Sequence, residues 1–319
     1  MNAGKMIRKT AAVMIILLIG YFYSLQVRNN WASLMNFTFT ISLPYLILAL
    51  SFCLSSFLLE TYLWQVCINR HLGRRELNFL QSIAVVNASG FLKYIPGRIW
   101  TYTAQLAWLR KYDISQTLII YINIICIAGS VITSLYLGLI YLAFYTTLLG
   151  RAAVITAFVA LFLLNLAYLV WNAPFMNAVI SAAGRLLQKE IHPIRESRSL
   201  IAYIQVMYIC SWSLLGLGAY LLAKGVGLTI VMPQAFAVLA AMSLSWVAGY
   251  LAVITPGGLG VREGTMLVML LNVVDTRTAL IFPIVSRLMY LASEALLGLT
   301  ALLLGIKYRV FSSRGNQPG

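Results

Sequence analysis

Long apolar runs dominate this sequence and leave little choice of fold. Three of them are AAVMIILLIGYFYSLQV (11–27), AVITAFVALFLLNLAYLVW (153–171) and LIAYIQVMYICSWSLLGLGAYLLA (200–223). Each approaches or exceeds the ~20 residues that an α-helix needs to cross a bilayer. Only 10% of the 319 residues are charged, too few to cover a water-exposed surface. The sequence therefore predicts an all-α polytopic membrane protein.

The net charge of +15 follows a topological pattern, not one typical of nucleic-acid binding. Of the 23 Lys and Arg residues, 15 lie in clusters, four lie singly in the alternate loops and four fall inside hydrophobic segments. The clusters occupy 5–9, 70–75, 110–111, 185–198 and 307–314. By the positive-inside rule, both termini and the clustered loops are expected in the cytoplasm, with the spans in the inner (plasma) membrane.

Two apolar stretches are interrupted at Pro-Gly, a pair that disfavours a continuous helix. We expect about six full transmembrane helices, at 10–27, 41–66, 117–147, 152–172, 200–223 and 278–305, and a cytoplasmic connection at 173–199. The interrupted stretches are 78–109 and 234–274. Their arms after the breaks would rise only ~16–20 Å against a hydrocarbon core of ~30 Å. Re-entrant helical hairpins are favoured, and two full spans at each place are the alternative.

The two breaks divide the chain into similar halves. Pro96-Gly97 is followed by DISQTLII (113–120), and Pro256-Gly257 by DTRTALIF (275–282). The first hairpin is expected to open from the cytoplasm and the second from the other side. We therefore interpret residues 1–319 as one membrane domain built as an inverted repeat, with halves 41–147 and 200–305, an arrangement typical of transporters. Chance similarity is the alternative.

No catalytic constellation is visible. The two histidines lie in predicted loops, and the eight acidic residues are scattered, so no zinc site or magnesium-diphosphate site is expected. We expect no cofactor, no metal and no enzymatic activity.

Charged residues inside the hydrophobic segments are the candidate site. Lys93 and Arg98 flank the first break, and Arg262 and Glu263 follow the second. A short helix that begins beside an arginine is suited to a phosphate headgroup. In the alternative, a carboxylate such as Glu263 only neutralises a buried arginine.

Further polar residues accompany them inside the apolar segments. The candidate intramembrane charge partners are Glu60, Arg287 and Glu294, of which the last two are seven residues apart and share a helical face. Asn87, Ser89 and Gln105 could supply neutral hydrogen bonds to a ligand or to freed backbone groups. Tyr94, Trp100 and Tyr102 could stack on a sugar or mark the bilayer interface.

Three motifs, KYIPGRIW (93–100), LRKYDIS (109–115) and PGGLGVREG (256–264), resemble the lysylphosphatidylglycerol synthase transmembrane-region family, also called flippase-like domain proteins. In its bifunctional members such a domain flips an aminoacylated anionic lipid, and a soluble domain attaches the amino acid. We expect no such soluble domain here, so the resemblance does not imply aminoacyl transfer, and the first motif is similar to that of stand-alone members associated with polysaccharide or glycolipid assembly. The resemblance implies functional roles for Lys93, Pro96, Gly97, Arg98, Pro256, Gly257, Gly258, Gly260, Arg262 and Glu263.

The favoured hypothesis is a lipid translocase. It would move an anionic phospholipid or a polyprenyl-phosphate-linked glycolipid between leaflets, in cell-envelope or polysaccharide assembly. The alternatives are a membrane-embedded subunit or enzyme of glycolipid or aminoacyl-lipid synthesis, and a structural scaffold. The expected partners are membrane lipids and glycolipid-synthesis enzymes.

Overall fold

A computed structural model of the chain describes residues 38–95, 99–112, 114–145, 150, 152–168, 198–252 and 255–311, with scattered positions between 21 and 35 and residue 178. Within these residues every regular element is an α-helix or a short 3-10 helix, and none is a strand. The predicted all-α fold is confirmed.

Five helices of the described chain are long and apolar enough to cross a membrane. They are α3 (Leu43–Leu72), α6 (Gln116–Tyr145), α8 (Arg198–Gly225), α9 (Met232–Leu251) and α11 (Thr276–Lys307). At 1.5 Å per residue they rise ~30–48 Å, which matches or exceeds the ~30 Å core of a bilayer. The chain is therefore a multi-pass membrane protein.

Four of these helices, α3, α6, α8 and α11, overlap predicted spans. The spans predicted for them are 41–66, 117–147, 200–223 and 278–305, in that order. The predicted span at 152–172 is represented by a shorter apolar helix, Ala152–Tyr168. The predicted span at 10–27 and the connection at 173–199 fall almost wholly outside the described residues.

The first interrupted stretch forms two short helices, α4 (Phe79–Gly90) and α5 (Ile99–Leu109), joined through the 3-10 helix η1 (Phe91–Tyr94). A capping box starts α4: Asn78 and Gln81 exchange side-chain-to-backbone hydrogen bonds of 2.8 and 2.9 Å. With 12 and 11 residues, α4 and α5 rise only ~16–18 Å. Neither crosses a bilayer alone, as expected of a re-entrant hairpin.

The second interrupted stretch is asymmetric. Its first arm, α9, has 20 residues and reaches ~30 Å. Its second arm, α10 (Val261–Leu270), follows the 3-10 helix η3 (Pro256–Gly258) and has only 10 residues. No proline interrupts the apolar sequence from Gln234 to Leu251, so the helix continues until the chain nears Pro256. By length alone, α9 can cross while α10 cannot.

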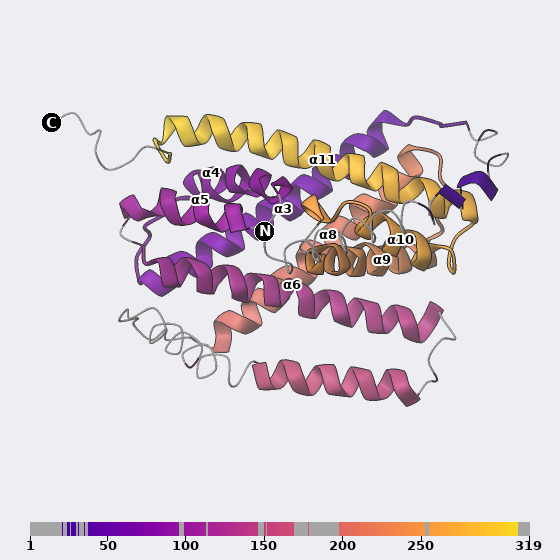
Figure 1. The fold of residues 1–319 in the computed structure, drawn as a ribbon, viewed down its shortest axis with the longest axis horizontal. Coiled ribbons are helices and arrows are strands. Elements are labelled where there is room, and N and C mark those ends of the chain that lie inside the picture. The colour runs from indigo at the N-terminus through magenta and orange to yellow at the C-terminus, as the bar shows by residue number, and fades with distance from the viewer. Residues whose placement is uncertain are drawn as a thin grey trace, which may run out of the picture.

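The two interrupted stretches lie at opposite ends of the molecule. In Figure 1, α4 and α5 lie near the end where α11 finishes, whereas α9 and α10 lie towards the end where α11 begins. Helix α11 packs against both α4 and α10, and α3 packs along α8. The inverted arrangement of the two halves stays a prediction.

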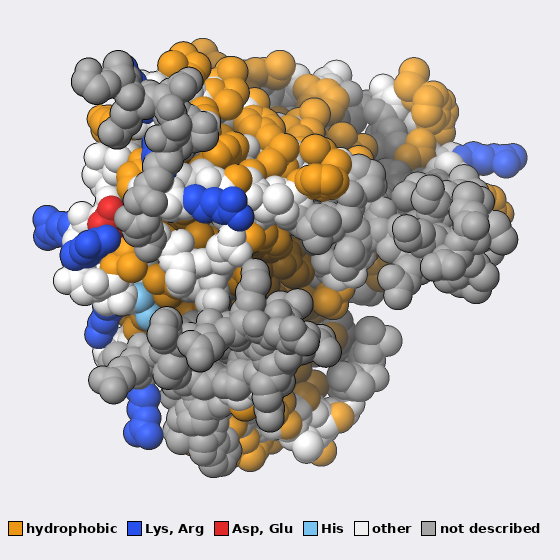
Figure 2. All heavy atoms as spheres, turned by 60° about the vertical axis from the view of Figure 1, so that its left-hand side comes forward, with side chains coloured by type: hydrophobic (Ala, Val, Ile, Leu, Met, Phe, Trp, Pro, Cys, Tyr) orange, Lys and Arg blue, Asp and Glu red, His pale blue; other side chains and the backbone are white. Residues whose placement is uncertain are grey.

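Basic residues of distant clusters meet at the end that holds α4 and α5. Arg70 donates a 2.8 Å hydrogen bond to Ser199 Oγ, and the Lys111 ammonium donates to the carbonyl oxygen of Arg309. Figure 2 shows Lys and Arg side chains gathered at this edge, beside a broad apolar surface. Clusters far apart in sequence therefore share one end of the molecule, as the positive-inside pattern requires.

Helix α11 is the longest described element, with 32 residues, and it contains Pro283. A proline in a helix interior lacks the N–H that would bond to the carbonyl four residues earlier, here that of Ala279. The ladder of backbone hydrogen bonds in α11 is therefore interrupted near its first quarter.

The second break depends on a close approach of two stretches of backbone. Gly258 has a φ of 74°, in the left-handed region that glycine adopts without a steric penalty. A Cβ on Gly258 would lie 2.9 Å from the Cα of Gly249 in α9. The absence of side chains at both glycines lets η3 lie directly on α9.

We expect Gly258→Ala to lower the free energy of unfolding by about 2–5 kcal/mol, because a left-handed residue and an overpacked contact are both unfavourable. Gly73→Ala is the matched control: Gly73 has a φ of 65°, but a Cβ added there would meet no heavy atom within 4 Å. It should lose only about 1–2 kcal/mol. Thermal unfolding in detergent measures which variant is less stable. An equal loss of stability in Gly258→Ala and Gly73→Ala would contradict the close backbone contact at Gly258.

Candidate functional site

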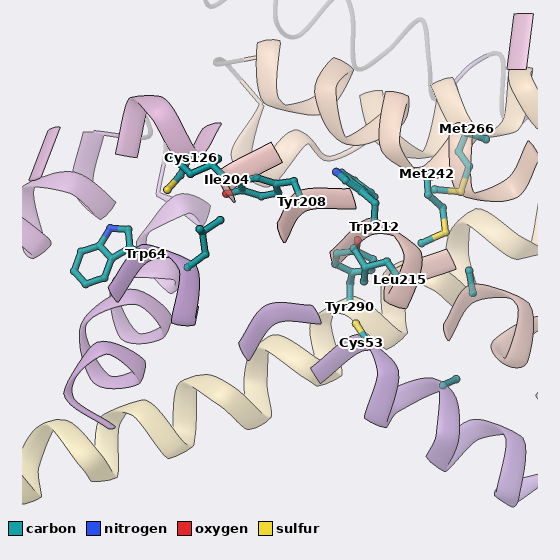
Figure 3. Close-up of a cluster of buried hydrophobic side chains, with 14 of the residues drawn as sticks. Cys53, Trp64, Cys126, Ile204, Tyr208, Trp212, Leu215, Met242, Met266 and Tyr290 are labelled. Atoms are coloured by element: carbon teal, nitrogen blue, oxygen red, sulfur yellow. The ribbon is translucent and has the colours of Figure 1, made fainter. Parts of the chain in front are cut away.

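A cavity of about 290 Å³ lies in the core between the two interrupted stretches. Its walls come from α3, α4, η1, α5, α6, α8, α9, α10 and α11. Figure 3 shows four of the bordering residues, Trp64, Cys126, Tyr208 and Tyr290, in the core between α3, α6, α8 and α11. Four charged residues border the same space: Glu60, Lys93, Arg262 and Glu294.

Lys93 and Glu294 form an ion pair that links η1 to α11. The Lys93 ammonium lies 2.5 Å from Oε1 of Glu294, and the Tyr94 hydroxyl donates a 2.6 Å hydrogen bond to Oε2. The Glu294 side chain is 18% exposed and that of Lys93 38%. Glu294 therefore neutralises Lys93 and anchors the first break to α11.

Arg262 lies in the first turn of α10, at the edge of the cavity. Its guanidinium carbon lies 5.1 Å from the centre of the Tyr290 ring, a cation–π contact. Within the described part of the chain, no carboxylate approaches Arg262 to within the 4 Å of an ion pair. Its charge is held by an aromatic face and is available to an anion in the cavity.

Glu263 lies away from this cavity. Its Oε2 accepts a 2.7 Å hydrogen bond from the backbone N–H of Gly260, and its Oε1 lies 3.6 Å from Nε of Arg287. The carboxylate of Glu263 thus binds the N–H of the residue that caps the start of α10. This placement supports the alternative that Glu263 neutralises a buried arginine.

Arg287 and Glu294 share a face of α11, as predicted, but take different partners. Arg287 donates a 3.3 Å hydrogen bond to the carbonyl oxygen of Gly257 in the second break, while Glu294 binds the first. The breaks also contact each other: a Cβ on Gly257 would lie 2.8 Å from the Tyr94 ring. Helix α11 therefore binds both breaks, which lie against each other beside it.

Glu60 reaches the cavity from α3. Its carboxylate accepts a 2.7 Å hydrogen bond from the Ser211 hydroxyl, which lies 2.8 Å from that of Ser56. Among the described residues, no cation pairs with Glu60 within 4 Å. Glu60 and Arg262 are thus opposite charges that border one space without being paired to each other.

Neutral polar residues of α3, α4, α5 and α6 are joined by hydrogen bonds beside the cavity. Gln105 donates a 3.0 Å hydrogen bond to Ser89 and accepts one of 2.8 Å from Asn123. Asn87 donates a 3.2 Å hydrogen bond to Thr61. Asn87, Gln105, Asn123 and Thr61 all border the cavity.

Other predicted residues lie elsewhere. Pro96, Gly97 and Arg98 fall outside the described residues, and Pro256, Gly258 and Gly260 form the backbone of the second break. Tyr102 borders the cavity, whereas Trp100 is 45% exposed on the outer surface, where an interfacial anchor would lie.

Several residues at or near the cavity were not predicted from the sequence. Asn123 is an amide inside the apolar α6 and borders the cavity, whereas Ser211 of α8 does not border it and holds Glu60 by a hydrogen bond. A polar amide inside a membrane span is costly, so its presence in the sequence can indicate a functional position. Trp64 and Thr101 could not be recognised in this way, since tryptophan and threonine are common in membrane helices.

The sequence model of one family, the lysylphosphatidylglycerol synthase TM region, matches residues 8–298. The chain belongs to the lysylphosphatidylglycerol synthase TM-region family. The match includes both breaks and every cavity residue named above, and it places the protein in a family of lipid-related biosynthesis or translocation. No curated protein matches the chain.

In this family member, the Lys93–Glu294 pair should be energetically coupled. In a double-mutant cycle of Lys93→Gln and Glu294→Gln, we expect a coupling free energy of about 1–3 kcal/mol, because the carboxylate is largely buried. The measurement is unfolding of the four proteins in mixed micelles.

The Arg74–Glu76 pair is the control, at 2.8 Å with Arg74 61% exposed. Its cycle of Arg74→Gln and Glu76→Gln should give at most about 0.2–1 kcal/mol. Similar coupling in both pairs would show that the contact between η1 and α11 does not anchor the break.

Proposed function

We propose that this protein is a lipid translocase and that the cavity receives the phosphate-bearing headgroup of its substrate. The substrate class is an anionic phospholipid or a polyprenyl-phosphate-linked glycolipid, moved between leaflets in cell-envelope or polysaccharide assembly. Membership of the family supports a lipid-related role.

The observation that supports this proposal most directly is that Arg262 borders the cavity without a carboxylate partner among the described residues. A guanidinium inside a membrane protein is costly unless an anion compensates it, and within the described chain no carboxylate pairs with this one. Because a guanidinium binds phosphate through charge-assisted hydrogen bonds, an anionic headgroup supplies the missing charge. Lys93, on the same cavity, could exchange Glu294 for phosphate.

The size of the cavity favours a lipid over a large solute. Its volume of about 290 Å³ is at the lower limit of the ~300–1,000 Å³ typical of ligand pockets. This is room for a headgroup, while the apolar tails stay in the bilayer beside the exposed apolar helix faces. The two interrupted stretches enter from opposite ends, which suits access from one leaflet at a time.

We also propose the cellular setting. The basic end of the molecule faces the cytoplasm, both termini lie on that side, and the protein resides in the inner (plasma) membrane. It acts on membrane lipids without chemical conversion, beside enzymes that make or consume the lipid.

Arg262→Gln should reduce translocation about 10–100-fold, because a hydrogen bond to a charged group contributes about 1.5–3 kcal/mol. Purified protein in vesicles would be tested with an acyl-labelled phosphatidic acid, whose exposure to an external quencher reports movement.

Lys307→Gln, at an exposed position in the last turn of α11, is the control and should leave the rate unchanged. A rate unaffected by Arg262→Gln would exclude the arginine from headgroup binding. Conversion of the lipid to a new product would favour an enzyme of lipid synthesis.

A further inference from the structure

We infer that the neutral wall of the cavity is a subsite for a polyhydroxylated headgroup, a sugar or a cyclic polyol joined to the phosphate. The wall comprises Trp64 of α3, Asn87 of α4, Thr101 and Gln105 of α5, and Asn123 of α6. The inference rests on the proposed function, which places the phosphate at Arg262, and it adds the chemical class of the group attached to that phosphate.

Two hydrogen-bonding groups on this wall have no partner in the described protein. They are the indole N–H of Trp64 and the hydroxyl of Thr101, and both atoms are buried. Trp64 is only 4% exposed, and Figure 3 shows its ring nitrogen in the core. A buried donor without a partner costs about 1–3 kcal/mol, which a hydrogen-bonding ligand in the cavity would recover.

The neighbouring amides present acceptors. Both N–H groups of Asn87 are used, by Thr61 and by the carbonyl oxygen of Ile83. Both N–H groups of Asn123 are used as well, by Gln105 and by the carbonyl oxygen of Ile119. Each amide therefore keeps its carbonyl oxygen, with two lone pairs, for a further donor.

The wall thus combines donors and acceptors without a net charge. A phosphate only accepts hydrogen bonds, an ammonium only donates them, and a hydrocarbon tail does neither. Hydroxyl groups do both, and a ring that carries several of them matches a wall on which donors and acceptors are mixed. Since Arg262 and Lys93 border the same cavity, one ligand can place its phosphate there and its hydroxyls on this wall.

The test compares two lipids with the same dioleoyl tails, phosphatidylinositol and phosphatidic acid. Native mass spectrometry of the detergent-solubilised full chain gives their apparent dissociation constants. We expect phosphatidylinositol to bind about 10-fold or more tightly than phosphatidic acid, since one hydrogen bond contributes about 0.5–1.5 kcal/mol and several would form. Equal affinities would overturn the subsite, because water alone would then satisfy the wall.

Thr101→Val is the diagnostic variant, because it removes a hydroxyl that has no protein partner to lose. It should reduce the preference for phosphatidylinositol about 2–12-fold while leaving the melting temperature equal or higher. Thr300→Val, on the exposed face of α11 with its hydroxyl bonded to its own helix, should change neither. Trp64→Phe removes the second donor and should act in the same direction as Thr101→Val; an unchanged preference in both variants would overturn the inference.

Two further arms separate this inference from the proposed function. Arg262→Gln should weaken both lipids and leave their ratio intact. If neither lipid binds the wild type more tightly than phosphatidylcholine, the phosphate site and the inference fail together. If free inositol 1-phosphate displaces phosphatidylinositol at equal concentration, the polyol subsite stands and the lipid proposal fails.

Discussion

The membrane interior offers no water to a charge or to an interrupted helix, and the rest of the structure depends on how this protein meets that constraint. Both breaks bring polar backbone and charged side chains into the apolar part of the chain. Helix α11 satisfies both, since Glu294 binds Lys93 and Tyr94 while Arg287 binds the carbonyl oxygen of Gly257. Without these contacts, each break would leave unpaired polar groups in hydrocarbon.

The charges around the cavity differ in how they are compensated. Lys93 has a carboxylate partner, whereas Arg262 rests on an aromatic ring and Glu60 on a serine hydroxyl. Ion pairs between the breaks and α11 organise the fold, and the less compensated charges face the space in which a ligand would lie.

The fold could be predicted to a large extent, because the length and position of an apolar run decide where a membrane helix lies. The short helices α4, α5 and α10 follow from the Pro-Gly breaks for the same reason. Pairings could not be predicted. Lys93 and Glu294 are 201 residues apart, and nothing in the local sequence tells which of several buried carboxylates Lys93 meets.

Other features were missed for different reasons. The interval from Gly260 to Glu263 is that of a capping carboxylate, a pattern that could have predicted the cap on α10. Trp64 and Thr101 could not have been found, because a missing hydrogen-bond partner is a property of the folded molecule alone. A single sequence does not show which buried polar groups will be left without a hydrogen-bond partner.

Pro283 lies between the start of α11 and the residues that hold the two breaks. Residues 276–282 precede the weakened turn, and Arg287 and Glu294, which hold the two breaks, both follow it. Both breaks are therefore attached to one helical segment on the same side of the proline. Because Arg287 and Glu294 lie on this one segment, any displacement of it would move both breaks together.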